Sequence, residues 1–314
     1  MIELTDTNAA KIAAAFVETR RSAASPMMGM VMTLVIVVDE DNATEAMRCA
    51  RAASHEHPAR VLGVIIGDGR GRARVAAEVG IGEGWTGETA LIRLTGEVTK
   101  HPASVVLPLL MPDSPVVVWW PNDHPADPST DPLGMLAQRR ITDAAAVTSG
   151  KSTALKRICA NYAPGTSDLA WTRLTLWRAM LAAAMDHQHL KVKSASVTAE
   201  KISPSADLMV EWLKWRLKVP VTRETSDGPG ITDVVLQTQD GPIEIRRGDG
   251  KLATFSSPDR PDRPLALRRR ELSELLAEEL PRLPDADIFA ESAKRPAEAS
   301  PLGFVAVMPG VRVR

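Results

Sequence analysis

Runs of apolar, largely β-branched residues alternate with polar or alanine-rich stretches through the first half of the chain. Such runs predict strands that are buried on both faces, as in parallel or mixed sheets. The clearest run, 115–120, ends in Trp119 and Trp120 and is stopped by Pro121. Because side chains alternate along a strand, the two indoles should face opposite sides of the sheet. The polar loop that follows should leave the carboxyl end of a core strand, where open α/β sheets place their sites.

The same pattern predicts an α/β domain over residues 1–165, with a mixed and largely buried sheet. Asp39 and Asp41 can begin a helix between two buried strands, which favours a parallel pair with a right-handed crossover. Glycines between two later strands suggest a hairpin. The expected strands are 30–38, 60–67, 72–79, 88–95, 115–120 and 141–147. The expected helices are one that ends near Arg21 and others at 39–55, 101–110, 132–138 and 152–161.

A loop at 163–167 marks the expected boundary, and residues 166–314 should form an α+β domain with an antiparallel meander. Asp168 and Ser203 are predicted helix caps, and each should begin a helix with an apolar face. Asp-Gly pairs between the later strands supply the positive φ angles of tight hairpins. The expected strands are 191–199, 231–238, 243–247, 252–256 and 264–268, and a helix at 271–280 should close this domain. The tail 293–301 is rich in Pro, Ala and charge and should be mobile.

Composition restricts the function further. The chain has 314 residues and a net charge of -1, so no basic field is expected to attract nucleic acid or anionic lipid. Its two cysteines, Cys49 and Cys159, are too few for a disulfide framework and indicate thiols in a reducing compartment. The longest apolar run has 12 residues, fewer than the ~20 that cross a bilayer. We therefore expect a soluble, cytoplasmic protein of two domains.

Several motifs resemble catalytic or ligand sites without completing them. Gly150-Lys151-Ser152 matches the end of a P-loop, but Ala145 stands where that loop needs its first glycine, so a helix start is expected. The segment 67–72 fails the dinucleotide fingerprint because Arg72 replaces its last glycine. Two His-x-His pairs, at 55–57 and 187–189, lack the further ligand that zinc requires. We predict no catalytic residue, no metal and no cofactor.

Tryptophan is the remaining signal, with seven Trp against one Tyr and four Phe. Tryptophan often anchors protein interfaces, and arginine is also enriched there. Most large aromatic side chains are nevertheless core residues, and Arg140 and Asp143 could simply pair inside the fold. The predicted partner-binding site consists of the loop after Trp120 with Trp119, Trp120, Pro121, Arg139, Arg140 and Asp143.

Seven stretches between residues 30 and 185 together resemble the bacterial glucose-6-phosphate dehydrogenase assembly protein family, OpcA. They are 32–37, 57–61, 101–110 with 112–121, 131–134, 138–143, 162–165 and 168–178. The most specific is His101-Pro102-Ala103-Ser104-Val105-Val106 followed by Pro115-Val116-Val117-Val118-Trp119-Trp120-Pro121. After residue 185 the chain is similar to the family only in its strand-rich pattern.

The resemblance implies a non-enzymatic partner that helps glucose-6-phosphate dehydrogenase assemble or activates it allosterically, in the oxidative pentose phosphate pathway that makes NADPH. Some family members are linked to thiol-based regulation, for which this chain offers only Cys49 and Cys159. One alternative is an enzyme or sensor that binds a sugar phosphate or nucleotide through Arg70, Arg72 or Lys151. Another is a scaffold that leaves the mature dehydrogenase.

Overall fold

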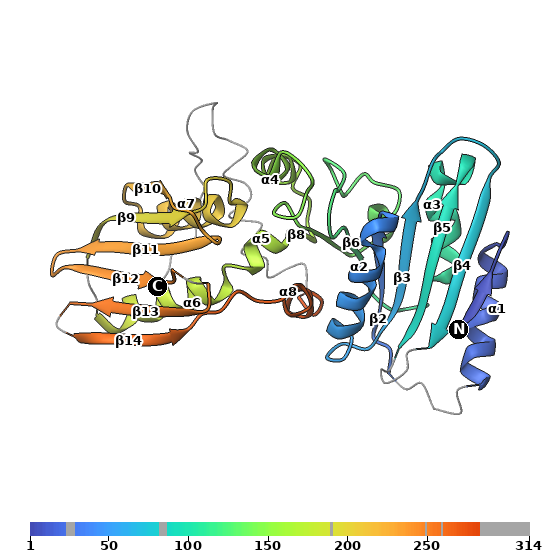
Figure 1. Ribbon diagram of the computed structural model, residues 1–314, viewed down its shortest axis with the longest axis horizontal. Coiled ribbons are helices and arrows are strands. Elements are labelled where there is room, and N and C mark those ends of the chain that lie inside the picture. Colours follow the sequence, from blue (N-terminus) through green and yellow to red (C-terminus); the bar gives the residue numbers. More distant parts are fainter. Residues whose placement is uncertain (23–28, 82–86, 189–190, 249, 259, 283–314) are drawn as a thin grey trace. The chain divides into compact units, whose positions relative to one another are not determined.

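The computed structural model describes residues 1–22, 29–81, 87–188, 191–248, 250–258 and 260–282, with side chains described up to residue 185 in the helix that ends at 188. The chain divides into two compact units. Among the described residues, the first comprises Met1–Ala146, Ala163–Ser167 and 272–282, and the second comprises Val147–Tyr162 and Asp168–Glu271. The expected mobile tail, 293–301, lies outside the described residues. Each unit is described by itself (Figure 1).

The first unit is built on a mixed sheet of eight strands in the order β1-β4-β5-β3-β2-β6-β7-β8. Its strands are β1 (Ile2–Leu4), β2 (Met32–Val38), β3 (Ala59–Ile66), β4 (Arg74–Ile81), β5 (Glu88–Thr95), β6 (Val116–Trp119), β7 (Arg139–Thr142) and β8 (Thr166–Asp168). Its helices are α1 (Ala9–Ser22), α2 (Glu40–Ala53), α3 (Pro102–Val106) and α8 (Leu272–Glu279), and its 3-10 turns are η1 (Gly96–Lys100), η2 (Leu107–Leu109) and η3 (Gly134–Leu136).

The central strands of this sheet are parallel, and the pairs β2–β3, β3–β5, β2–β6 and β6–β7 run the same way. The predicted β-α-β order is confirmed, with Asp39 capping α2 by accepting a hydrogen bond from the Asn42 amide. The predicted hairpin is also confirmed, because β4 and β5 are antiparallel. The mixed, buried sheet expected from the apolar runs is therefore present.

Helices cover both faces of the first sheet. Phe16 of α1 packs with Leu62 and Val64 on one face. A Cβ added to Gly63, whose side chain would point to the other face, would lie 2.8 Å from the sulfur of Met47 in α2. Helix α8 also contacts α2, so it packs in the first unit, whereas its sequence position suggested that it closes the second.

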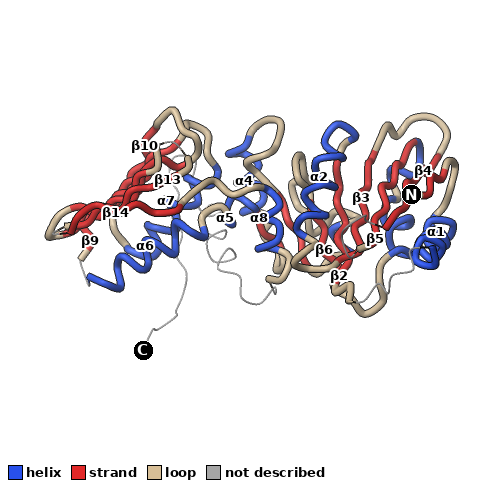
Figure 2. Tube along the Cα trace, turned by 60° about the horizontal axis from the view of Figure 1, so that its bottom comes forward, coloured by secondary structure: helices blue, strands red, loops and turns tan. Residues whose placement is uncertain are grey.

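The second unit has a six-stranded sheet in the order β10-β9-β11-β12-β13-β14 (Figure 2). Its strands are β9 (Val192–Ala199), β10 (Val221–Thr225), β11 (Ile231–Thr238), β12 (Pro242–Arg246), β13 (Leu252–Ser257) and β14 (Arg260–Ala266). Its helices are α4 (Lys151–Ala160), α5 (Leu169–Thr172), α6 (Thr175–Gln188) and α7 (Pro204–Leu217). Strands β11 to β14 pair antiparallel in sequence, which confirms the meander and extends it by one strand.

Some boundaries differ from those expected. The strand expected at 141–147 is β7 and ends at Thr142, because Asp143 accepts a hydrogen bond from the Ala145 amide and turns the chain. The helix expected after Asp168 is divided into α5 and α6. Sequence reasoning missed the strands β1, β8 and β10, which are short and lack a sustained apolar alternation.

Candidate partner-binding site

Trp119 ends strand β6 and Trp120 follows it, and the two side chains lie on opposite faces of the first sheet, as expected. Trp120 packs with Val116 and Val118 in the cluster that also contains Phe16, and Trp119 lies outside that cluster. Pro121 follows and is also buried, while the Trp120 amide donates a hydrogen bond to the carbonyl oxygen of Ile141 at 2.9 Å. The Trp120 indole also lies against the loop, because a Cβ added to Gly134 would lie 3.2 Å from its ring.

The Trp119 indole is fully buried, and its Nε1 has no hydrogen-bond partner among the described residues. An unpartnered buried donor costs about 1–3 kcal/mol. Burying ~200 Å² of indole surface at ~25 cal/mol per Å² contributes about 5 kcal/mol. The apolar term is the larger, so the side chain is stable in this position.

Arg140 joins the loop 121–138 to the segment 163–167. Its Nη1 donates to the carbonyl oxygens of Ala137 at 2.8 Å and Gly134 at 3.3 Å, and its Nε donates to the Thr166 hydroxyl at 3.1 Å. Its Nη2 donates to the carbonyl oxygen of Pro164. One buried guanidinium thus satisfies acceptors on two segments that flank β7, which a planar group with five donors can do.

Arg139 contacts helix α8. It forms an ion pair with Glu279 of α8, with 3.1 Å between Nη2 and Oε2, and both side chains are almost fully buried. Arg139 and Arg140 are therefore structural contacts in the described chain, and the Asp143 side chain is buried as well.

The loop between β6 and β7 is ordered by local hydrogen bonds. Asp131 accepts from the amides of Leu133 and Gly134 and so begins η3. Asp127 accepts from the Ser129 hydroxyl and amide, and the hydroxyl contact holds its pKa below the usual value. A Cβ on Gly134 would lie 1.8 Å from the carbonyl oxygen of Pro128, so only glycine allows this close approach.

Met135 is a large exposed apolar side chain on this loop, with 64% of its surface accessible. The six residues that sequence reasoning named, which include Pro121 and Asp143 besides two tryptophans and two arginines, are all buried, and Met135 was not among them. The signal that could have found it is its position beside Gly134 in a short turn, where the following Leu136 and preceding Leu133 supply the packing. Of the six predicted residues, Trp120 and Arg140 contact the loop from inside the first unit, and the loop surface includes Met135.

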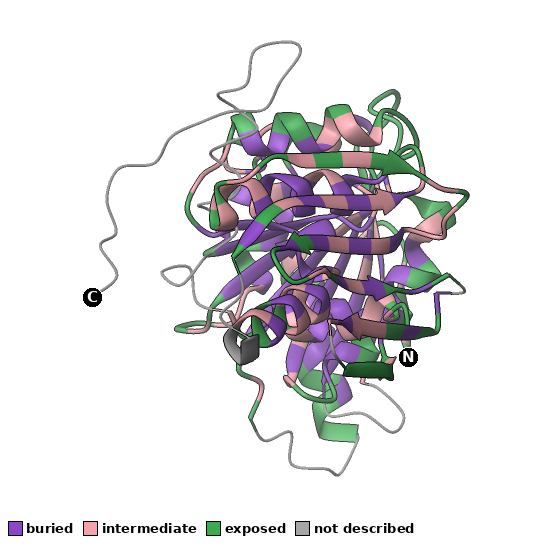
Figure 3. Cartoon of the chain, turned by 90° about the vertical axis from the view of Figure 1, so that its left-hand side faces the viewer, coloured by how far each residue is buried: buried purple, intermediate pink, exposed green. Residues whose placement is uncertain are grey.

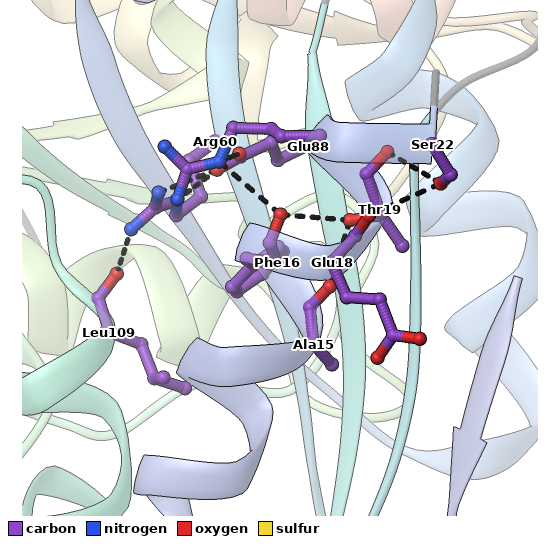
Figure 4. Close-up of polar contacts among 9 residues, drawn as sticks. Ala15, Phe16, Glu18, Thr19, Ser22, Arg60, Glu88 and Leu109 are labelled. Atoms are coloured by element: carbon purple, nitrogen blue, oxygen red, sulfur yellow. Dashed lines mark hydrogen bonds and ion pairs between the residues drawn. The ribbon is translucent and has the colours of Figure 1, made fainter. Parts of the chain in front are cut away.

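A second polar cluster in the first unit surrounds Glu88 (Figure 4). The sequence offered no indication of this cluster beyond an arginine and a glutamate at the starts of two strands. The fully buried Glu88 carboxylate accepts a hydrogen bond from Arg60 Nε at 2.8 Å, and its other oxygen lies 2.8 Å from Arg20 Nε. Arg60 also donates to the carbonyl oxygen of Leu109 at 2.7 Å and lies 4.8 Å from the ring centre of Phe16. The cluster fastens α1 and η2 to the amino ends of β3 and β5.

The incomplete motifs have structural roles. Helix α4 begins at Lys151, as predicted, with Gly150 at φ 66 as its N-cap. The glycine-rich segment after β3 leads into β4, a strand, as predicted. Within the described ranges, no group of three His, Cys, Asp or Glu side chains could hold a metal ion. No helix in the described part of the chain is long and apolar enough to cross a membrane.

Both cysteines are buried free thiols. Burial raises the pKa of the Cys159 thiol, and the nearby Asp168 carboxylate raises it further. The Cys49 sulfur lies 3.4 Å from Oε1 of Glu45, whose pKa is lowered to about 2 chiefly by its hydrogen bond with Arg48. A buried thiol with a raised pKa carries little of the reactive thiolate, which disfavours Cys159 as a redox sensor.

Two OpcA family models match the chain in succession. Residues 50–160 match the model described as the N-terminal domain of a glucose-6-phosphate dehydrogenase subunit, and residues 164–293 match the model described as its C-terminal domain. Together they cover more than half of the chain. No curated protein matches it.

Two solved structures show weak similarity. One is a mutant of KijD10, a 3-ketoreductase from Actinomadura kijaniata, in complex with TDP-benzene and NADP. It has a TM-score of 0.44 at 10% identity, over 85% of this chain and 94% of that chain. The other, trehalose-6-phosphate from E. coli bound with UDP-2-fluoro glucose, has a TM-score of 0.25 at 14% identity, over 62% of this chain and 65% of that chain. Neither similarity is high enough to support an argument about fold or function.

Proposed function

This chain belongs to the glucose-6-phosphate dehydrogenase assembly protein (OpcA) family, and we propose on that premise that it binds the dehydrogenase and promotes its assembly or allosteric activation without catalysing a reaction itself. The observation that carries the proposal is the pair of family models, which match residues 50–160 and 164–293 with the domains in the expected order. The resemblance that spans residues 30–185 supports the same assignment.

Such a protein acts through a difference in affinity. A binder shifts the equilibrium between two states of an oligomer only as far as it prefers one of them. A preference of about 2.7 kcal/mol shifts that equilibrium about 100-fold. The protein therefore needs a contact surface that the active form of the dehydrogenase matches better than the inactive form does.

We assign one contact to the surface of the loop 121–138, with Met135 as its apolar residue. The predicted residues Trp120 and Arg140 hold this loop from inside the first unit. Methionine adapts its shape to a partner and is enriched at interfaces. The buried residues thus serve the interface by positioning the loop, and the exposed loop residues make the contact.

The nucleotide- or sugar-phosphate-binding alternative is less favoured. The helix that follows β2 in the parallel sheet begins with Asp39, Glu40 and Asp41, and Asp39 already accepts the amide of Asn42. Glu40 pairs with Arg93, and the carboxylates of Asp39 and Asp41 disfavour a phosphate at the place where such sheets bind one. Calorimetry with glucose 6-phosphate, NADP and ATP tests this directly, and tight binding with turnover would reject the adaptor proposal.

The proposal is tested by measuring dehydrogenase activity and oligomeric state with and without the full chain. We expect Met135→Asp to weaken the apparent affinity for the dehydrogenase about 10-fold, because a charge would be buried against an apolar partner surface. Gel filtration should show a stable complex for the native chain, which would exclude a scaffold that departs after assembly. An unaltered dehydrogenase in the presence of the native chain would refute the proposal.

Met135 is a sharper test than the tryptophans. Trp119→Ala and Trp120→Ala each remove a buried indole and are expected to cost about 3–5 kcal/mol of folding free energy, so a loss of activation would follow from unfolding alone. The matched control is Ile202→Asp, which places the same charge on another exposed apolar residue of the chain. Equal loss of affinity in both variants would contradict the assignment of the loop.

A further inference from the structure

The six-stranded sheet of the second unit has one face that is open in the described structure. Along the cross-strand row Val197, Val234 and Ile245 the side chains are buried, which identifies the inner face. The two rows on either side of it point the other way, and all their members are half-buried or exposed. Their members on strands β9 to β13, ten residues that we call the open face, are Thr222, Ser196, Val235, Glu244 and Ser256 in one row and Glu224, Thr198, Asp233, Arg246 and Thr254 in the other. Figure 3 shows the resulting alternation of buried and more exposed residues along the strands.

The open face is polar and acidic. Half of its ten residues bear a hydroxyl group, and only Val235 is apolar. It carries the carboxylates of Glu224, Asp233 and Glu244 and one guanidinium, so its net charge at neutral pH is about -2. Arg246 is committed to its neighbours, since its Nε lies 2.9 Å from the Asp233 carboxylate and its Nη2 pairs with Glu244.

This face is well prepared for a hydrogen-bonded contact. Serine and threonine side chains have few rotamers to lose, so ordering them on binding costs less than ordering lysine or glutamate. Their hydroxyl groups both donate and accept, which allows them to match varied partner groups. They stand on a paired strand ladder, so the backbone beneath them does not need to be ordered when a partner arrives.

The charge and shape of the open face select among occupants. The acidic sign disfavours nucleic acid and anionic lipid. A second copy of this chain would bring two acidic faces together, which is unfavourable in a symmetric contact. The apolar side of a helix would contact a single apolar residue, Val235, among polar groups, so a helix is disfavoured as the occupant. A flat protein surface rich in lysine or arginine satisfies both the carboxylates and the hydroxyl groups.

We infer that the open face is a second docking surface, and that its occupant is a basic surface of the dehydrogenase. This inference rests on the proposed function and adds to it a contact made by the second unit, independent of the loop that carries Met135. Because the attraction is electrostatic, it should act mainly on the rate of association and should weaken as salt is added.

The test measures binding of the full chain to glucose-6-phosphate dehydrogenase at low and at physiological salt. Replacing both Glu224 and Glu244 with lysine (Glu224→Lys with Glu244→Lys) changes the open face from -2 to about +2. We expect the association rate at low salt to fall at least about 10-fold, with loss of its salt dependence. Ser196→Arg places a long basic side chain in the middle of the face and should have a similar effect. The control Glu56→Lys, at an exposed position of the first unit, should change the rate less than about 2-fold.

Each outcome decides the inference. Circular dichroism and thermal unfolding first establish that the variants are folded, which is expected because the altered side chains lie on the face opposite the buried row of Val197, Val234 and Ile245. If the native chain activates the dehydrogenase and the open-face variants do so equally well, the inference is overturned and the proposed function stands. If the variants instead change the size of the chain alone in gel filtration, the occupant is a second copy and the inference is again overturned. A native chain that does not bind the dehydrogenase overturns both.

Discussion

Arg140→Met should lower the free energy of unfolding of the first unit by about 3–5 kcal/mol. The arginine is buried and donates to the carbonyl oxygens of Gly134, Ala137 and Pro164 and to the Thr166 hydroxyl. Methionine has a similar length but no donor, so the carbonyl oxygens of Ala137 and Pro164 would lose this donor, whereas that of Gly134 would keep the Ala137 amide at 3.2 Å. Each such buried group costs about 1–3 kcal/mol, reduced where the loop can relax towards water.

Urea unfolding measures this effect as a lower midpoint, and hydrogen exchange locates it in segments 134–138 and 163–167. Arg140→Lys is the control that keeps the positive charge. Lysine is a point charge without a planar fork and cannot reach all four acceptors, so it should restore only part of the lost stability. If Arg140→Met had the same urea unfolding midpoint as the native chain, the role of Arg140 in fastening the loop would be disproved.

The same variant links the fold to the proposed function. Since the loop that bears Met135 depends on Arg140, Arg140→Met should also weaken binding to the dehydrogenase, whereas the open face of the second unit should be unchanged. Binding that remains salt-dependent but weaker is therefore the expected result for this variant.

Glu88→Gln is expected to have the second large effect on stability, about 3 kcal/mol. Glutamine keeps the size of the side chain but removes the charge that faces Arg60 and Arg20. The Arg60 side chain is only 12% exposed, so its guanidinium would remain mostly buried without a counter-charge. Removing one partner of a buried ion pair costs about 3–5 kcal/mol, and the partial exposure of Arg20 places the expected loss at the lower end.

The control for Glu88→Gln is Glu97→Gln, because Glu97 and Lys100 form an ion pair at 3.0 Å with both side chains 64% exposed. An exposed pair of this kind contributes at most about 0.5 kcal/mol in a helical turn. Differential scanning calorimetry should therefore separate the two variants clearly. Similar melting temperatures for both would mean that Glu88 is solvated in solution and that the cluster does not hold α1 on the sheet.

Much of the fold was accessible from local sequence. Apolar β-branched runs marked β2, β3 and β6 because a strand buried on both faces must be apolar throughout. Asp39, Asp168 and Ser203 marked the starts of α2, α5 and α7 because their side chains accept the first free amides. These signals are reliable because the burial of a strand and the cap of a helix both depend on residues that are close together in the sequence.

The strands β1, β8 and β10 could not be predicted in this way. Each has three to five residues, and each is a strand because a longer neighbour offers it a ladder of hydrogen bonds. The packing partner of α8 could not be predicted either. Its apolar residues indicate that one face is buried, but they do not indicate which surface covers that face. Both depend on contacts between residues far apart in the chain.

For the candidate site, the sequence predicted a location at the loop after Trp120, and it determined the alternation of the two indoles across the sheet. Only the tertiary structure decided which residues are exposed: it buries Arg139 with Glu279 across 140 positions of sequence and places Met135 at the surface. The physical reason is that periodicity and capping are local, whereas the desolvation of a charge depends on the partner that folding brings to it. The sequence by itself also carried the family resemblance, while the open face of the second unit emerged only from the pairing register of its strands.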